Sequence, residues 1–162
     1  MNGLKKLMLR PPRLTLAVAE SLTCGRVQAA IGAEPGASAY FRGGVTAYSL
    51  EQKVKLLGVN RAHARRVNCV SQRVAVEMAR GACWLFGADL AVATTGYAEP
   101  SRADRVKVPR AWWALCHWKR GGAVIISGLL ELPGATRGQA QARIAEAVLS
   151  RLARYLREVR KR

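Results

Sequence analysis

Apolar residues form two patterns along the chain. Continuous runs are typical of buried strands, and spacings of three and four are typical of helices. Continuous apolar runs are typical of strands covered on both faces of a sheet. The run from Leu14 to Ala19 stops at a small polar cluster, and the run from Leu90 to Thr95 stops at polar residues and a glycine. We expect strands over 14–19, 40–48, 90–95, 111–118 and 123–131.

Apolar positions at spacings of three and four mark the helices. Ser49 and Ser71 are suitable N-cap residues for two of them, and Gly58 and Gly87 stand where a C-terminal glycine ends a helix. Helices are expected from about 26 to 32 and over 50–57, 60–66, 72–86 and 135–159.

The order of these elements predicts a single α/β domain over 14–162, preceded by a basic N-terminal tail over 1–13. We expect a mixed, mostly parallel sheet flanked by helices, with an antiparallel hairpin around 119–122, where the connection is short. The charged segment 97–110 is predicted to be a mobile loop. We expect it at the same edge of the sheet as Ser21 and Thr95.

Composition narrows the class of protein. The 162 residues suffice for one domain with a core, and no apolar run is long enough to cross a membrane. The short basic N-terminus lacks the apolar region of a secretory leader, so we expect a cytoplasmic protein. Four widely spaced cysteines and two histidines argue against a zinc site and a disulfide framework.

The chain carries 27 Lys and Arg against 10 Asp and Glu, a formal charge of +17. Such an excess attracts polyanions, including nucleic acids. The basic residues are scattered through many segments, however, and we favour a solvated surface over a nucleic-acid groove.

Ser21 is the leading candidate nucleophile, because it stands where the first strand gives way to a helix. Open α/β sheets bind ligands at such junctions. A serine hydroxyl needs a neighbouring base, and neither His63 nor His117 has a clear acidic partner. A desolvated lysine is the other solution, and spacing alone does not choose between Lys53 and Lys55.

Cys24 is a rival nucleophile, since a helix N-terminus favours a thiolate. Cysteines more often serve as small apolar residues in a core, and we expect that role for most of the four.

Five blocks of sequence, in order, resemble the C-terminal domain of the CinA competence/damage-inducible protein family, whose stand-alone members include nicotinamide-nucleotide amidases. The resemblance covers about 14–156, nearly the whole chain. The blocks are Ala19–Gly25 (A-E-S-L-T-C-G), Pro35–Val45 (P-G-A-S-A-Y-F-R-G-G-V), Tyr48–Val59 (beginning Y-S-L-E-Q-K), Val70–Ala79 (beginning V-S-Q-R-V-A) and Thr95-Gly96.

The resemblance implies hydrolysis of the amide of nicotinamide mononucleotide to nicotinate mononucleotide and ammonia, with no metal or cofactor. Ser21 would be the nucleophile and Lys53 the general base, with Tyr48 in the proton relay and Thr95 assisting at the same edge. The resemblance, with exposed aromatic residues, also implies a homo-oligomer. The substrate-binding positions would be Thr23, Cys24, Gly25, Gly96 and Arg137.

The start of the helix after Ser21 is suited to anions. Its backbone N–H groups around Thr23 to Gly25 could hold the oxyanion, and the helix N-terminus and arginines would suit the substrate phosphate.

The chain departs from the family pattern in the loop opposite Ser21, which reads A-E-P-S-R-A-D over 98–104 and lacks the family's glycines. Thr136 also replaces the Asp of the family's G-D-R segment. A different reading therefore stays open: a catalytically weak or inactive homologue that binds a nucleotide or nucleic acid through its basic surface.

Overall fold

Five strands form one mixed sheet in the order β2-β1-β3-β4-β5. The computed structural model describes residues 3–161. Strand β1 pairs in parallel with β2 and β3, whereas β3–β4 and β4–β5 are antiparallel. The predicted α/β domain with a mixed sheet flanked by helices is confirmed, and the sheet holds two parallel and two antiparallel pairs. The strands are β1 Leu16–Glu20, β2 Phe41–Thr46, β3 Leu90–Tyr97, β4 Arg110–Lys119 and β5 Gly122–Glu131.

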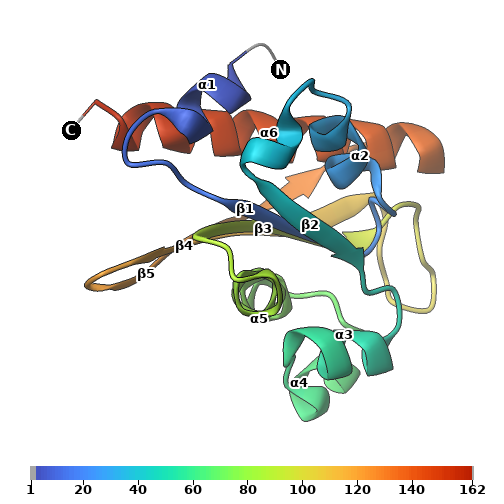
Figure 1. Cartoon of the computed structure of the whole chain (residues 1–162). Coiled ribbons are helices and arrows are strands. Elements are labelled where there is room, and N and C mark those ends of the chain that lie inside the picture. The colour runs from blue at the N-terminus through green and yellow to red at the C-terminus, as the bar shows by residue number, and fades with distance from the viewer. Residues whose placement is uncertain (1–2, 162) are drawn as a thin grey trace.

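Helices cover both faces of the sheet (Figure 1). Helices α1, α2 and α6 lie on one face, while α5 lies on the other, with α3 and α4 beyond it. The helices are α1 Leu4–Leu9, α2 Arg26–Gly32, α3 Leu50–Leu57, α4 Arg61–Arg66, α5 Gln72–Phe86 and α6 Arg137–Val159, with a 3-10 turn at Ala37–Ala39. None of the helices between residues 3 and 161 has the length and apolar character needed to span a bilayer.

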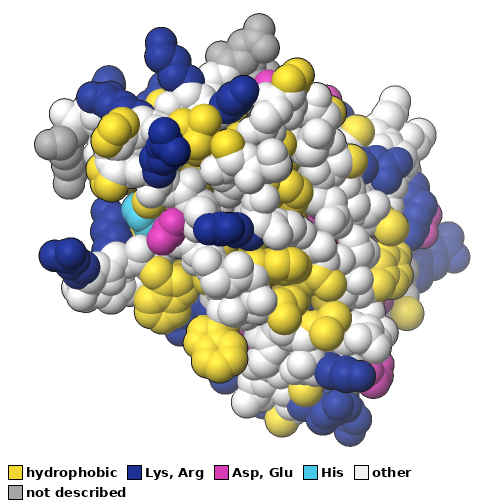
Figure 2. All heavy atoms as spheres, viewed as in Figure 1, with side chains coloured by type: hydrophobic (Ala, Val, Ile, Leu, Met, Phe, Trp, Pro, Cys, Tyr) yellow, Lys and Arg dark blue, Asp and Glu magenta, His cyan; other side chains and the backbone are white. Residues whose placement is uncertain are grey.

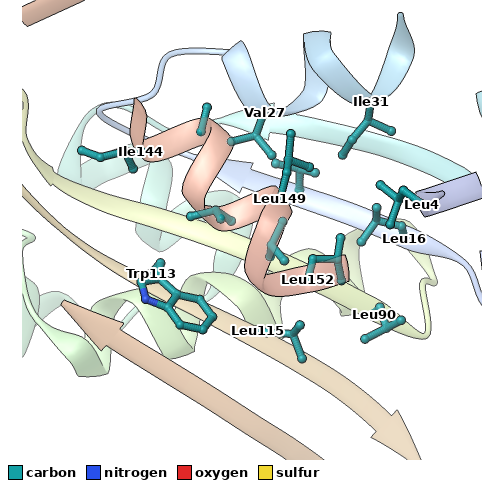
Figure 3. Packing of buried hydrophobic residues seen from close by; sticks show 14 of the residues in the cluster. Leu4, Leu16, Val27, Ile31, Leu90, Trp113, Leu115, Ile144, Leu149 and Leu152 are labelled. Atoms are coloured by element: carbon teal, nitrogen blue, oxygen red, sulfur yellow. The ribbon is translucent and has the colours of Figure 1, made fainter. Parts of the chain in front are cut away.

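The two central strands send side chains of different size to the two faces. Leu16 and Val18 of β1 join the core under α6, whereas Ala17 and Ala19 join the core under α5. Strand β3 repeats this pattern over Leu90–Ala93, because successive strand residues point to opposite faces. The larger side chains interlock with those of α1, α2 and α6 (Figure 3). The side chains that β1 and β3 turn toward α5 are alanines, so only small side chains separate these strands from α5.

The structure defines two elements more closely than the sequence does. Residues 4–9, for which the basic N-terminal segment allowed either a frayed tail or a short helix, form the helix α1, and its Leu4 and Met8 are buried in the core that also contains α6. Helix α6 begins at Arg137, two residues later than expected, because Thr136 and Gln139 form a capping box at its start.

Lys and Arg side chains are spread over several parts of the face shown in Figure 2 rather than gathered into one patch. This distribution agrees with a solvated basic surface.

Candidate active site

Ser21 directly follows β1 and is almost completely buried. A short turn joins it to α2 and carries two residues with left-handed backbone, Cys24 at φ 51° and Gly25 at φ 91°. The Cys24 N–H donates to the Ser21 carbonyl across 3.1 Å. The Cys24 side chain itself is exposed, so this thiol is not one of the buried apolar residues.

Helix α3 brings Lys53 to Ser21. The Lys53 side chain is 1% exposed, and its Nζ lies 2.9 Å from the Ser21 Oγ. The same Nζ donates to the carbonyl oxygens of Ala47 at 2.8 Å and Tyr48 at 2.9 Å. Lys55 follows two residues later and is exposed, because residues two apart face different sides of a helix. Of the two candidate lysines, the structure therefore brings Lys53 to the serine.

Burial lowers the pKa of Lys53. The charge interaction with the nearby Cys69 raises this pKa, but by less than burial lowers it. The ion pairs among residues 3–161 are Arg73–Glu77 and Arg137–Glu99, so no carboxylate compensates the buried amine. A neutral amine has two N–H groups and one lone pair. In the structure the Nζ donates to the Ser21 Oγ as well as to the two carbonyl oxygens. In its neutral form the amine would keep one N–H group for each carbonyl oxygen and turn its lone pair toward the Ser21 hydroxyl.

Glu20, which sequence reasoning missed, organises the turn. Its carboxylate is fully buried and accepts the backbone N–H groups of Gly25 at 3.0 Å, Val27 at 3.1 Å and Gln28 at 2.9 Å. A carboxylate at a helix N-terminus is favoured by the helix dipole and by the unpaired N–H groups there. The signal in the sequence was an acidic residue inside an otherwise apolar strand end, just before a helix.

The expectation that the first N–H groups of α2 bind substrate anions is wrong in part. Gly25 donates to Glu20, and Cys24 donates to the Ser21 carbonyl. The N–H groups of Leu22 and Thr23 donate to no atom between residues 3 and 161. They are the donors left for an oxyanion, and the α2 N-terminus is already occupied by Glu20 rather than open to a phosphate.

The threonines at this sheet edge bond to one another and to the backbone. Thr23 and Thr94 share a hydroxyl hydrogen bond of 2.7 Å. The Thr95 hydroxyl donates to the Cys69 carbonyl at 2.7 Å, and so fixes the segment that places the Cys69 thiol near Lys53. Gly96 is required by packing, since a Cβ there would lie 2.7 Å from the Ala111 Cα on the paired strand.

Tyr48 contributes its carbonyl to Lys53, while its side chain is 55% exposed and points elsewhere. The Tyr48 hydroxyl accepts a hydrogen bond of 3.0 Å from Arg137, which also forms an ion pair of 2.6 Å with Glu99. The structure therefore joins Tyr48 to Arg137 and the loop, and its hydroxyl bonds to neither Ser21 nor Lys53.

A cleft of about 290 Å³ lies beside Tyr48, Arg137 and the loop that follows β3. Its lining residues are Leu22, Tyr48, Gly96, Tyr97, Ala98, Glu99, Pro100, Ser101, Asp104 and Arg137. A larger cavity of about 760 Å³ runs between α1, α2 and α6, but its lining contains none of Ser21, Lys53 or Tyr48. We place the candidate site at the smaller cleft because it is lined by Leu22, the residue after Ser21, and by Tyr48, whose carbonyl oxygen holds the Lys53 Nζ. Ser21 and Lys53 are buried behind this lining rather than part of it.

Neither histidine reaches Ser21. The His63 Nε2 is 2.9 Å from the Ser71 Oγ, and the His117 Nδ1 is 2.8 Å from the Tyr155 hydroxyl in the core. Cys83 and Cys116 are buried, as expected for apolar residues, and Cys69 is partly buried.

The family model of the CinA C-terminal domain matches residues 4–156. The chain belongs to this family. A CinA-like protein of Chlorobium limicola is 41% identical over 154 residues, which are 94% of this chain and 36% of that protein. The chain thus spans about a third of the length of the curated relatives it matches. A putative competence-damage inducible protein of Desulforudis audaxviator is 46% identical over 94 residues, 58% of this chain and 23% of that protein.

Solved structures of CinA superfamily proteins share the fold. One from Klebsiella pneumoniae has a TM-score of 0.82 at 27% identity and covers 93% of this chain and 92% of its own. One from Escherichia coli has a TM-score of 0.80 at 26% identity and covers 91% of this chain and 84% of its own.

Proposed function

We propose that this CinA-family protein is an amide hydrolase that uses Ser21 as nucleophile and Lys53 as general base, and that it deamidates nicotinamide mononucleotide to nicotinate mononucleotide and ammonia. The observation that carries the proposal is the 2.9 Å contact between the Lys53 Nζ and the Ser21 Oγ. The amine is 1% exposed and has no carboxylate partner between residues 3 and 161.

The reaction begins with neutral Lys53. Its lone pair takes the proton of the Ser21 hydroxyl as the oxygen attacks the carboxamide carbon. The N–H groups of Leu22 and Thr23, for which no partner lies between residues 3 and 161, are the donors we assign to the oxyanion that forms. Lys53 then returns the proton to the amide nitrogen, the C–N bond breaks, and ammonia leaves an acyl ester on Ser21.

Water completes the cycle. It attacks the ester carbonyl while Lys53 removes one of its protons, and the proton returns to the Ser21 oxygen as the ester bond breaks. The products are a carboxylate and the free enzyme. The two carbonyl oxygens of Ala47 and Tyr48 keep the amine directed at Ser21 through both halves of the reaction.

The choice of substrate rests on the family resemblance, and the cleft supports it by its composition. Tyr48 and Tyr97 both line the cleft and offer aromatic faces to a pyridine ring. Arg137 and Glu99 stand at the same opening, as groups that can hydrogen-bond the ribose hydroxyls.

The proposal is tested by ammonia release from nicotinamide mononucleotide. We expect release by the wild type and a fall in kcat of about 10²-fold or more in Ser21→Ala and in Lys53→Ala. Lys55→Ala is the matched control, because it truncates the other lysine of the same helix at an exposed position, and it should retain activity. Absence of ammonia with the wild type, or full activity in Ser21→Ala, would disprove the proposal.

A further inference from the structure

The candidate cleft differs in charge from the rest of the molecule. The chain carries a formal charge of +17, and Lys and Arg side chains are spread over the face shown in Figure 2. The cleft lining, however, has two carboxylates, Glu99 and Asp104, against one guanidinium, Arg137. Arg102 and Arg105 belong to the same loop but do not line the cleft.

The one guanidinium of the lining is already engaged. Arg137 donates through one nitrogen to the Glu99 carboxylate at 2.6 Å and through another to the Tyr48 hydroxyl at 3.0 Å. A phosphate that enters the cleft must therefore compete with Glu99 for Arg137 and approach a negative charge as it does so.

Asp104 is also held in its charged form at this opening. Hydrogen bonds from the Ser101 hydroxyl and the Asn68 amide lower the pKa of its carboxyl. The cleft thus presents carboxylates and two tyrosine rings, which favour an aromatic cation. Its volume, about 290 Å³, is near the lower end for ligand sites.

We infer that Glu99 sets substrate selectivity at this site by opposing a phosphate, so that N-ribosyl nicotinamide without its phosphate is hydrolysed at least as well as the mononucleotide. The inference rests on the proposed function for its chemistry. It is carried separately by the charge of the cleft and by the Glu99–Arg137 ion pair.

The experiment compares the two substrates in the wild type and in Glu99→Gln, which keeps the side-chain shape and removes the charge. Glu158→Gln is the matched control, since it changes the net charge equally at an exposed position of α6, about 30 Å along the helix from Arg137. The measured quantity is the ratio of kcat/KM for the mononucleotide to that for the riboside.

We expect a wild-type ratio of one or less, and a rise of about three- to tenfold in Glu99→Gln, as expected for one screened charge acting on a phosphate dianion. Glu158→Gln should leave the ratio unchanged. A wild-type ratio well above one, or equal shifts in both variants, would overturn the inference.

Binding separates this inference from the proposed function. Titration calorimetry of Ser21→Ala, with and without Glu99→Gln, gives the ratio of dissociation constants for the two compounds without turnover. If no ammonia is released but Glu99→Gln strengthens mononucleotide binding relative to the riboside, the proposed function fails and the selectivity of the cleft stands. If neither compound binds, or the binding ratio does not move, the inference fails even where ammonia is released.

Discussion

The Nζ atom of Lys53 lies 2.9 Å from the Oγ atom of Ser21, although 32 residues separate them in the chain. The contact depends on α3, which starts after the Ser49 N-cap. Lys53, near the start of this helix, is buried and reaches Ser21 at the end of β1.

Activity should follow the protonation of Lys53. Burial lowers the pKa of this amine below its ordinary value of 10.5, and only the neutral amine accepts the serine proton. We therefore expect kcat/KM to rise with pH and to level off at a pH clearly below 10.5. A pH–rate profile of wild type and Lys55→Ala should show the same midpoint. A rate that is still climbing at pH 10 would contradict this assignment.

Replacing Glu20 by Gln should weaken both stability and activity. The carboxylate accepts three N–H groups in a fully buried position, and an amide offers one oxygen and places an NH₂ group against those donors. We expect a loss of about 2 kcal/mol or more in the free energy of unfolding, measured in urea.

A positioning role for Glu20 predicts a particular kinetic pattern in that variant. Because the turn holds Ser21 rather than the substrate, kcat should fall more than KM rises at a temperature where the variant is folded. Glu34→Gln, a partly exposed glutamate just past α2, serves as control. Unchanged kcat in a folded Glu20→Gln protein would exclude this role.

Gly81 should be needed for the placement of α3. A Cβ at this position of α5 would lie 2.6 Å from the Leu57 Cα, a backbone atom at the end of α3. Gly81→Ala must push α3 away, so we expect a loss of about 1–3 kcal/mol in stability and a lower kcat through displacement of Lys53.

Gly32→Ala is the matched control for this change, because a Cβ at Gly32 of α2 meets no atom within 4 Å. It should leave kcat unchanged. Thermal unfolding and ammonia release on both variants test the prediction, and equal effects of the two would refute it.

The folded state should lose stability in mild acid because of His117. Burial lowers the pKa of this imidazole from 6.5 to about 4, so the unfolded chain binds a proton that the folded chain does not. Stability therefore falls as the pH decreases from 6.5 toward 4, by about 1–3 kcal/mol. Urea unfolding of wild type and His117→Gln at pH 7 and pH 4.5 measures this. The same pH dependence in both proteins would argue against it.

Local patterns predicted most elements because helix caps and continuous apolar runs are local features of the sequence. The helix over Leu50–Leu57 has both its Ser49 cap and its terminal Gly58 in the sequence. Local patterns could not identify the base that pairs with Ser21, because only folding brings α3 to the end of β1. The family resemblance pointed to Lys53. Glu20 was missed because its three contacts lie on the turn and helix that follow it, and its acidic character at an apolar strand end marks the position without naming those partners. The orientation of Tyr48 likewise depends on Arg137, 89 residues away.

The Glu20 carboxylate has a further consequence for how the site meets its ligand. Because an anion from the chain itself fills the start of α2, the turn that carries Ser21 keeps its shape without any bound molecule. The nucleophile is then pre-organised, and little binding energy is spent on ordering it. Amide hydrogen exchange at Gly25, Val27 and Gln28 should accordingly be slow in the empty protein and change little when a ligand enters.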